Sequence, residues 1–426
     1  QDSIRVVNDS IVGGNNTAQV VAGIYLQTGV NSAAFVRDNY ISVTRSASGG
    51  GNLYGIWNAF GGTPLQNTIE ISGNSIIDCY HPATSTGNLY GIYNTGGAGD
   101  LKIFDNLIDG STLAGTAEHY GVYSSPAGTV QSIYDNQIRN LENTGTGKLV
   151  GIYTGTFTTT NTYANHLLNF NANGGTVYGI QAASGANINL YGNDINGLSS
   201  NNGSTASSLV YGIYQVGGTN IAIYNNFITD LAAGDATNNP SLCGLYLAGG
   251  TAIKCYYNTV YLNAESTGTT FGSAALYAST TPTLDFRNNI LVNTSGHGAT
   301  GHTVAFRRGT STSLTSYAST SNNNCFHAGT PGSNNLIFYN VNWADQTIGD
   351  FKLRVAPRDA LSFSEIPPFA DTVAPAIDVH IQTNVPSFCE GGASTITTPA
   401  ITTDMDGDDR YPNPGYPDHP SYPASA

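Results

Sequence analysis

The 426-residue chain has few charged residues: 14 Lys and Arg and 28 Asp and Glu, together 10% of the sequence. An ordinary soluble protein has about 25%. The formal net charge is −14, whereas nucleic-acid binding depends on Lys and Arg that neutralise phosphates. The composition therefore argues against nucleic acid as a partner, and equally against an anionic membrane surface.

Long apolar segments are also missing. The sequence contains no run of about 18 apolar residues, so we expect no membrane insertion. Its first residues lack the basic and apolar regions of a signal peptide. Methionine occurs once, whereas Gly occurs 51 times and Tyr 26 times. Such a chain is poor in helix formers and typical of turn-rich β structure.

What the sequence does contain is a repeat in which a Gly lies inside a short apolar and aromatic run, as in LYGIW, HYGVY and VYGIY. The spacings between successive glycines are 32, 36, 30, 30, 28, 33 and 32 residues. A fixed period of this length indicates stacked structural units. The glycines are Gly23, Gly55, Gly91, Gly121, Gly151, Gly179, Gly212 and Gly244.

A second phrase follows in each unit: a short strand, then Asn, then an apolar residue two positions later, as in KIFDNLI and AIYNNFI. An aromatic residue precedes the Asn by two positions in Phe104, Tyr134, Tyr163, Tyr191, Tyr224 and Tyr256. Stacked Asn amides can donate to and accept from one another. The predicted Asn ladder is Asn8, Asn39, Asn74, Asn106, Asn136, Asn165, Asn193, Asn226, Asn258 and Asn289, with a degraded copy near Asn323.

Both phrases are 5 to 8 residues long, rich in β-branched and aromatic residues, and bounded by Gly, Asn, Ser or Thr. They predict short strands that bury their apolar sides by stacking on the next unit. The repeat resembles that of pectin-lyase-like parallel β-helix proteins over about residues 4–330. We therefore predict an all-β, right-handed parallel β-helix (solenoid) of about eleven coils over 1–333.

The repeat fades after about residue 330. Residues 334–356 are expected to form C-terminal capping strands, and 357–426, which hold 11 of the 17 prolines, a Pro-rich extended tail. The motif DMDGDDR at 404–410 resembles the closing segment of secreted β-helix proteins from bacteria with type IX secretion. That resemblance implies a secreted or cell-surface protein.

Candidate chemistry is sparse. Asp105 and Asp135 each precede a ladder Asn, so they would stack and could share a proton, as acid and base of a polysaccharide enzyme do. Trp57 could stack on a sugar. Asp404, Asp406 and Asp408 alternate around a Gly as in a Ca²⁺ loop, although the acidic residue that ends an EF-hand loop is missing.

Five cysteines at wide spacing, without CxxC, do not form a disulfide framework. Cys243 and Cys255 are the one pair that falls within a single coil, so they are the candidates for a bridge.

Two functions remain open. The first is a non-catalytic extracellular structural or adhesive rod that binds cell-surface glycans or assembles with its own copies head to tail into filaments through exposed strand edges. It needs no cofactor, although Ca²⁺ could bind the tail. The second is a polysaccharide lyase or glycoside hydrolase that acts in a groove along the helix. Sparse acidic residues favour the first.

Overall fold

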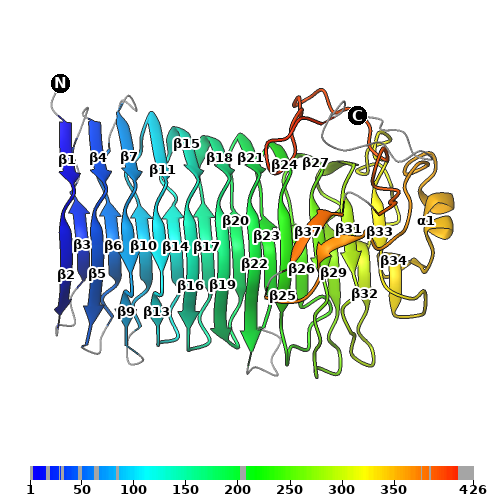
Figure 1. Ribbon diagram of the computed structural model, residues 1–426, viewed down its shortest axis with the longest axis horizontal. Coiled ribbons are helices and arrows are strands. Elements are labelled where there is room, and N and C mark those ends of the chain that lie inside the picture. The colour runs from blue at the N-terminus through cyan, green and yellow to red at the C-terminus, as the bar shows by residue number, and fades with distance from the viewer. Residues whose placement is uncertain are drawn as a thin grey trace.

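The computed structural model describes residues 3–15, 20–27, 29, 33–46, 50–61, 67–82, 86–201, 208–375, 377–382 and 385–410. It is a parallel β-solenoid of about ten turns, built from three long sheets that we call A, B and C. Figure 1 shows the turns stacked side by side into a rod, with β1 at one end and α1 at the other. The all-β solenoid predicted from the repeat is therefore confirmed.

Sheet A contains the strand that precedes each ladder Asn, and its neighbours pair in parallel. Sheet A has ten strands. In the coil after the tenth strand, two isolated β-bridges replace a strand and join Leu284 to Tyr317 and Arg287 to Asn322. The strands are β1 (Ser3–Val7), β4 (Ala33–Arg37), β7 (Thr68–Ser72), β11 (Asp100–Phe104), β15 (Gly128–Tyr134), β18 (Phe157–Tyr163), β21 (Asn187–Tyr191), β24 (Asn220–Tyr224), β27 (Ala252–Tyr256) and β30 (Thr283–Arg287).

Sheet B follows the Asn in each coil and carries the predicted row of Ile, Leu and Val in register. Its strands are β2 (Ser10–Asn15), β5 (Tyr40–Arg45), β8 (Ser75–Ile77), β9 (Tyr80–His81), β12 (Leu107–Asp109), β13 (Thr112–Leu113), β16 (Gln137–Asn143), β19 (His166–Asn173), β22 (Asp194–Asn201), β25 (Phe227–Ala232), β28 (Thr259–Leu262), β31 (Ile290–Asn293) and β33 (Cys325–His327).

Sheet C contains the Gly phrase and is parallel up to its last strand, which is antiparallel. Its strands are β3 (Val21–Leu26), β6 (Leu53–Asn58), β10 (Leu89–Asn94), β14 (His119–Ser124), β17 (Leu149–Thr154), β20 (Val177–Ala182), β23 (Val210–Gln215), β26 (Leu242–Leu247), β29 (Ser273–Ala278), β32 (Thr303–Arg308), β34 (Asn335–Tyr339) and β35 (Ala344–Asp345).

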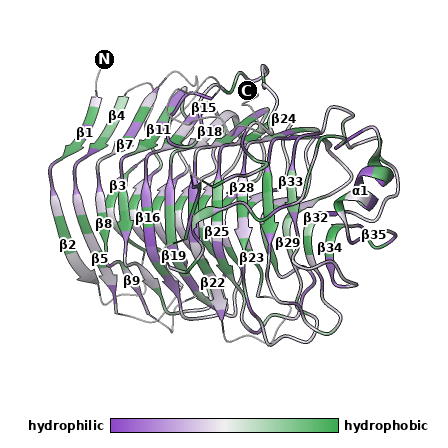
Figure 2. Cartoon of the chain, turned by 45° about the vertical axis from the view of Figure 1, so that its right-hand side comes forward, coloured by the Kyte–Doolittle hydropathy of each residue, from purple (hydrophilic) through white to green (hydrophobic). Residues whose placement is uncertain are grey.

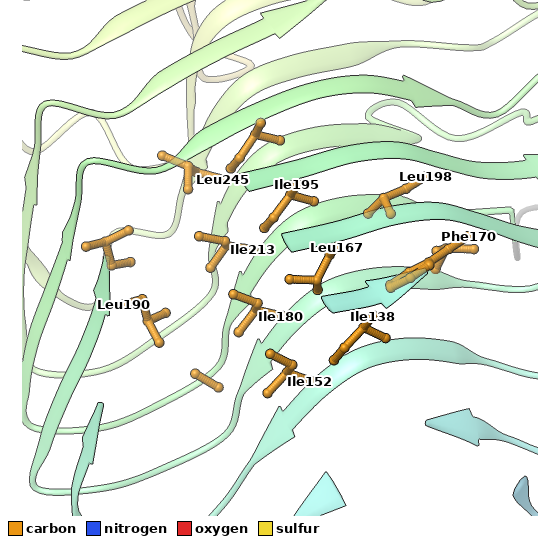
Figure 3. Packing of buried hydrophobic residues seen from close by; sticks show 14 of the residues in the cluster. Ile138, Ile152, Leu167, Phe170, Ile180, Leu190, Ile195, Leu198, Ile213 and Leu245 are labelled. Carbon is orange, nitrogen blue, oxygen red and sulfur yellow. The ribbon is translucent and has the colours of Figure 1, made fainter. Parts of the chain in front are cut away.

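The core lies inside the three sheets, because alternate side chains of each strand point inward. Figure 2 shows hydrophobic and hydrophilic residues alternating along the strands. In Figure 3, Ile138 of β16 and Leu167 of β19 form one column that faces Ile152 and Ile180 of sheet C. All four side chains are buried.

The recurrent glycines lie where two coils approach each other closely. A Cβ added to Gly55, Gly91, Gly121 or Gly179 would lie 2.6 Å from a carbonyl oxygen of the next coil. This close approach of the backbones is why the position tolerates no side chain.

The Asn ladder crosses the corner between sheets A and B. Each side-chain amide donates to the Oδ1 atom of the next coil at 2.8–3.0 Å. The prediction was wrong in the first coil. Asn8 lies one residue before the ladder position and has the left-handed backbone conformation (φ 59°) of that corner. Asp9 occupies the ladder position, and its backbone N–H donates to Asn39 Oδ1. At the other end the ladder residue is Asn324 and not Asn323.

The ladder ends on a buried carboxyl group. Asp359 accepts from the amide of Asn324 at 3.0 Å and from the hydroxyls of Tyr317 and Ser362. Burial raises the pKa of Asp359 to about 6, more than these three donors lower it. The folded state therefore favours the neutral acid.

Asp359→Asn is expected to raise stability above pH 6. The pKa of an aspartate is about 3.8 in the unfolded chain and about 6 for Asp359 in the folded protein. The stability that Asp359 contributes is therefore complete below pH 3.8 and is lost as the pH rises from 3.8 to about 6. The advantage of the variant should grow over that window to about 3 kcal/mol. Thermal midpoints of both proteins from pH 4 to 8 test this, and a constant difference between them contradicts it.

The pH dependence of wild-type stability does not isolate Asp359, because His119 changes stability with pH in the opposite direction. Burial lowers the pKa of His119 to about 4, so the stability that its neutral form contributes is lost as pH falls below about 6.5. The difference between the two proteins removes this shared contribution.

The predicted capping strands over 334–356 are replaced in part by a helix. The strands β34 and β35 form an antiparallel pair, and α1 (Ile348–Val355) follows. Thr347 caps the helix by accepting from the Asp350 N–H, and Phe351 and Val355, one turn apart, are buried in the core. The helix ends before Pro357, which cannot continue it.

The described part of the tail folds back along the rod. Its strands β36 (Phe369–Asp371) and β37 (Asp378–Ile381) pair with each other and pack on Tyr261 and Val292 of sheet B. Further along, Ile396 and Ile401 pack on Tyr256 of sheet A. Figure 1 shows this orange and red segment lying across the green and yellow strands. Residues 411–426 of the predicted tail lie outside the described residues.

Candidate functional site

The tail crosses the corner between sheets A and B, where each coil has a residue just before the ladder Asn. This residue adopts a positive φ in every coil. In earlier coils it is mostly Asp or Gly, whereas in the last four it is Asn225, Tyr257, Asn288 and Asn323. Asn tolerates this conformation and also offers a donor and an acceptor.

These corner residues hold the tail. Asn288 donates to the Ser394 carbonyl at 2.7 Å and accepts from the Ser394 N–H at 3.0 Å, as a neighbouring strand would. Asn225 donates to the Thr403 carbonyl at 2.8 Å. Asn323 likewise donates to a tail carbonyl at 2.9 Å. The change from Asp and Gly to Asn along the corner is a sequence signal for tail docking, and the sequence analysis missed it.

Arg410 adds a fourth attachment. Its guanidinium lies 3.7 Å from the centre of the Tyr257 ring and donates to Asn225 Oδ1 at 2.8 Å. The Tyr257 hydroxyl donates to the Ser394 carbonyl at 2.9 Å. A cation over an aromatic face that is shielded from water is a favourable contact.

A cavity of about 310 Å³ lies beneath the tail. Its floor is the outer face of sheet B and the corner, and its roof is the tail. The apolar residues of the floor include Phe227 and Ile290, and those of the roof include Val379, Ile381, Val385 and Met405. Polar groups reach it from both sides: Asn225 and Asn288 from the floor, and His380, Asp404, Asp406 and Arg410 from the roof.

His380 links two parts of the tail across the cavity. Its Nδ1 atom contacts Asp378 and its Nε2 atom lies 2.9 Å from Asp406 Oδ2. Burial lowers the pKa of His380, but the two carboxylates raise it more, so the net change is upward. The imidazolium therefore joins β37 to the acidic turn that follows Thr403.

The predicted calcium residues have other partners. Asp404 Oδ1 accepts the backbone N–H groups of Asp406 and Asp408 at 3.0 and 2.9 Å and so closes the turn. Asp406 pairs with His380, and Asp408 is exposed. In the part of the chain that the structure describes, no group of three or more His, Cys, Asp or Glu is placed to hold a metal ion.

Asp105 and Asp135 lie opposite each other in successive coils, at the corner and far from the tail. Burial and the neighbouring Asp105 charge raise the pKa of Asp135. His166 follows in the next coil; its hydrogen bond to Asp194 at 3.4 Å raises the pKa of this imidazole. The structure thus brings the two predicted carboxyls together and adds a histidine that the sequence analysis did not include.

Trp57 belongs to an aromatic row on the outer face of sheet C. Beneath it lies a second row, which includes the buried Tyr54 and Tyr90. Trp57 stacks on Tyr54 with ring centres 4.8 Å apart and an interplanar angle of 28°. One residue per coil forms the outer row: Tyr25, Trp57, Tyr93, Tyr123, Tyr153, Gln181, Tyr214, Tyr246 and Tyr277.

The aromatic ladder of sheet A differs from this row. Its rings from Phe104 to Tyr224 lie 4.7–4.8 Å apart with interplanar angles of at most 4°. Each ring face is therefore covered by its neighbour. In the outer row of sheet C, Trp57 and Tyr93 are tilted by 59°, and Tyr93 and Tyr123 by 35°.

The predicted cysteine pair is wrong. Cys243 lies in the cluster on the outer side of sheet C, whereas Cys255 lies in the core beside sheet A, and both thiols are free. The cysteines that meet are Cys325 and Cys389, which both line the cavity.

No protein-family model matches this chain, and no curated protein or solved structure is significantly similar to it. The fold defines the protein as a parallel β-solenoid. The finer resemblances, to pectin-lyase-like proteins and to proteins of type IX secretion, stay predictions from the sequence. Among the described residues, no helix has the length and apolar character needed to cross a membrane.

Proposed function

We propose that the protein is a non-catalytic, secreted or cell-surface rod that binds neutral glycan chains along the outer face of sheet C. The observation that carries the proposal is the outer aromatic row. Eight of its nine positions from Tyr25 to Tyr277 are aromatic, and the next position in register is Arg307.

The spacing and chemistry of the row suit a polymer of sugars. Successive strands are one coil apart, about 4.8 Å, and the ring centres of neighbouring aromatic residues in the row lie 4.3–6.2 Å apart, similar to the length of one pyranose unit. The tilted rings between Tyr25 and Tyr123 leave parts of their faces open to the C–H face of a sugar. Burial raises the pKa of Tyr93 and of Tyr153, so these phenols keep the O–H donors that sugar hydroxyls accept.

Trp57→Ala is expected to weaken binding to an insoluble neutral polysaccharide about tenfold, the equivalent of one lost stacking contact. Co-sedimentation with cellulose, chitin and β-1,3-glucan measures this. Tyr163→Ala, which removes a ring from the covered ladder of sheet A, is the matched control and should bind as wild type.

Trp57→Phe separates binding from packing, because it keeps a ring on Tyr54 and should retain most of the affinity. Absence of binding to every neutral polysaccharide, or an equal loss in the Trp57 and Tyr163 variants, contradicts the proposal.

The second candidate is a polysaccharide-cleaving enzyme at Asp105 and Asp135. What favours it is the raised pKa of Asp135 beside a second carboxyl, since a neutral acid next to an ionised one is the arrangement that glycosidases use. Unsaturated or reducing-end products that vanish in Asp135→Asn would support it over the binding rod.

Of the described residues, those at the N-terminal end of the rod are the candidates for end-to-end assembly with a second copy. The helix α1 covers the C-terminal end of the core. A second copy would therefore have to use β1, β2 and β3, which are edge strands of the described residues and expose Ile4 and Val12.

A further inference from the structure

Two thiols from distant parts of the chain meet where the tail covers the rod. Cys325 begins β33, the last strand of sheet B, and Cys389 lies in a turn of the tail. Both line the cavity described above. Cys325 is buried and Cys389 is partly exposed.

Glu365 lies between the two cysteines and contacts both. The Cys325 thiol donates to the Glu365 carbonyl at 3.5 Å. The Cys389 N–H donates to the Glu365 carboxylate at 3.2 Å. Separate contacts hold each backbone: Cys325 forms a bridge with Phe363, and the Phe363 ring packs on Phe388 at 5.9 Å.

The two thiols also lie close enough to interact, since Cys325 raises the pKa of Cys389. The remaining three cysteines have different surroundings. Cys79 and Cys255 are buried in the core, and Cys243 is buried under the outer row of sheet C. Cys325 and Cys389 are thus a placed pair.

We propose that Cys325 and Cys389 form a reversible disulfide that fastens the tail to the rod. The oxidant is a small disulfide such as oxidised glutathione. The thiolate of Cys389, the more accessible of the two, attacks it and releases one small thiol. The Cys325 thiolate then attacks the Cys389 sulfur of the mixed disulfide and releases the second small thiol. Two protein thiols are oxidised and one small disulfide is reduced.

The closeness of the two thiols also makes the reaction slow at neutral pH. The neighbouring Cys325, together with burial, raises the pKa of Cys389, and only the thiolate is a nucleophile. The rate should therefore rise about tenfold per pH unit below that pKa. This device goes beyond the proposed glycan binding and does not depend on it.

The test is peptide mapping of the whole protein after incubation with oxidised glutathione at pH 7.5 and 8.5. Free thiols are alkylated after denaturation. We expect two of the five thiols to be lost and one cross-linked peptide pair, containing Cys325 and Cys389, to be lighter by two hydrogens. Cys79, Cys243 and Cys255 should be alkylated. Dithiothreitol should restore all five thiols.

Two variants separate a specific bridge from general oxidation. Cys389→Ser should leave Cys325 free to be alkylated, whereas Cys243→Ser should form the bridge at the wild-type rate. After limited proteolysis of the oxidised wild type, the tail fragment should stay attached to the rod without reductant and separate with it. Five alkylated cysteines, a stable glutathione adduct on Cys389 or a bridge between other cysteines would overturn the proposal.

Discussion

Asn136→Asp is expected to destabilise the protein by about 4 kcal/mol, the cost of an unpaired buried charge. Asn136 is fully buried in the middle of the ladder. Its amide nitrogen donates at 2.9 Å to the carbonyls of Ile103 and Tyr134 and to Asn165 Oδ1. An aspartate has no donor when ionised and one when protonated, so three oxygen atoms would face a carboxylate or lose their partners.

The adjacent residue provides the control. Asp135→Asn changes the same functional group in the reverse direction at a corner position with φ 52°, which Asn adopts readily. Its effect should stay within about 0.5 kcal/mol. Urea unfolding followed by circular dichroism compares the two, and hydrogen exchange at Asn106, whose N–H donates to Asn136 Oδ1, locates the damage. Similar unfolding midpoints for both variants would show that the ladder contributes little.

Gly121→Ala is expected to destabilise the protein by about 3 kcal/mol, near the upper end for overpacking a core. The new Cβ would lie 2.6 Å from the Gly151 carbonyl oxygen and 2.7 Å from the Ile138 Cγ2 atom. The carbonyl belongs to the strand ladder, so the coils would have to separate locally.

Gly13→Ala is the matched substitution in the solenoid wall. A Cβ at Gly13 meets nothing within 4 Å, so this variant should be neutral or slightly stabilising. Adding Ile138→Leu to Gly121→Ala should recover part of the loss, because leucine has no Cγ2 methyl group and only the carbonyl contact then remains. Thermal midpoints measure all three. A wild-type midpoint for Gly121→Ala would contradict the close approach of the coils.

The repeat could be predicted because each coil places the same residue in the same surroundings. Asn106 and Asn136 occupy the same position of the repeated phrase, as do Phe104 and Tyr134. Residues at equivalent positions lie next to each other in successive coils and have equivalent neighbours. The first coil was misaligned by one residue because Asn8 and Asp9 are both residues that suit a corner. In the structure, the positive φ of Asn8 and the backbone hydrogen bond from Asp9 to Asn39 distinguish them.

The candidate sites were less predictable. The stacking of Asp105 on Asp135 follows from the repeat, whereas the pKa of Asp135 depends on how deeply that corner is buried. Trp57 could be assigned to an aromatic row, but the tilt that distinguishes this row from the ladder of sheet A depends on packing against Tyr54 and its neighbours.

The sequence by itself determined the solenoid, its period and most of its ladders, because these features rest on contacts between equivalent positions of adjacent coils. The tertiary structure alone decided where the tail lies, which thiols meet and what partners His380 and Asp406 have. These contacts join segments that share no repeat, as between Asn225 and Thr403, so no spacing in the sequence records them. The cavity beneath the tail and the Cys325–Cys389 pair belong to this second group.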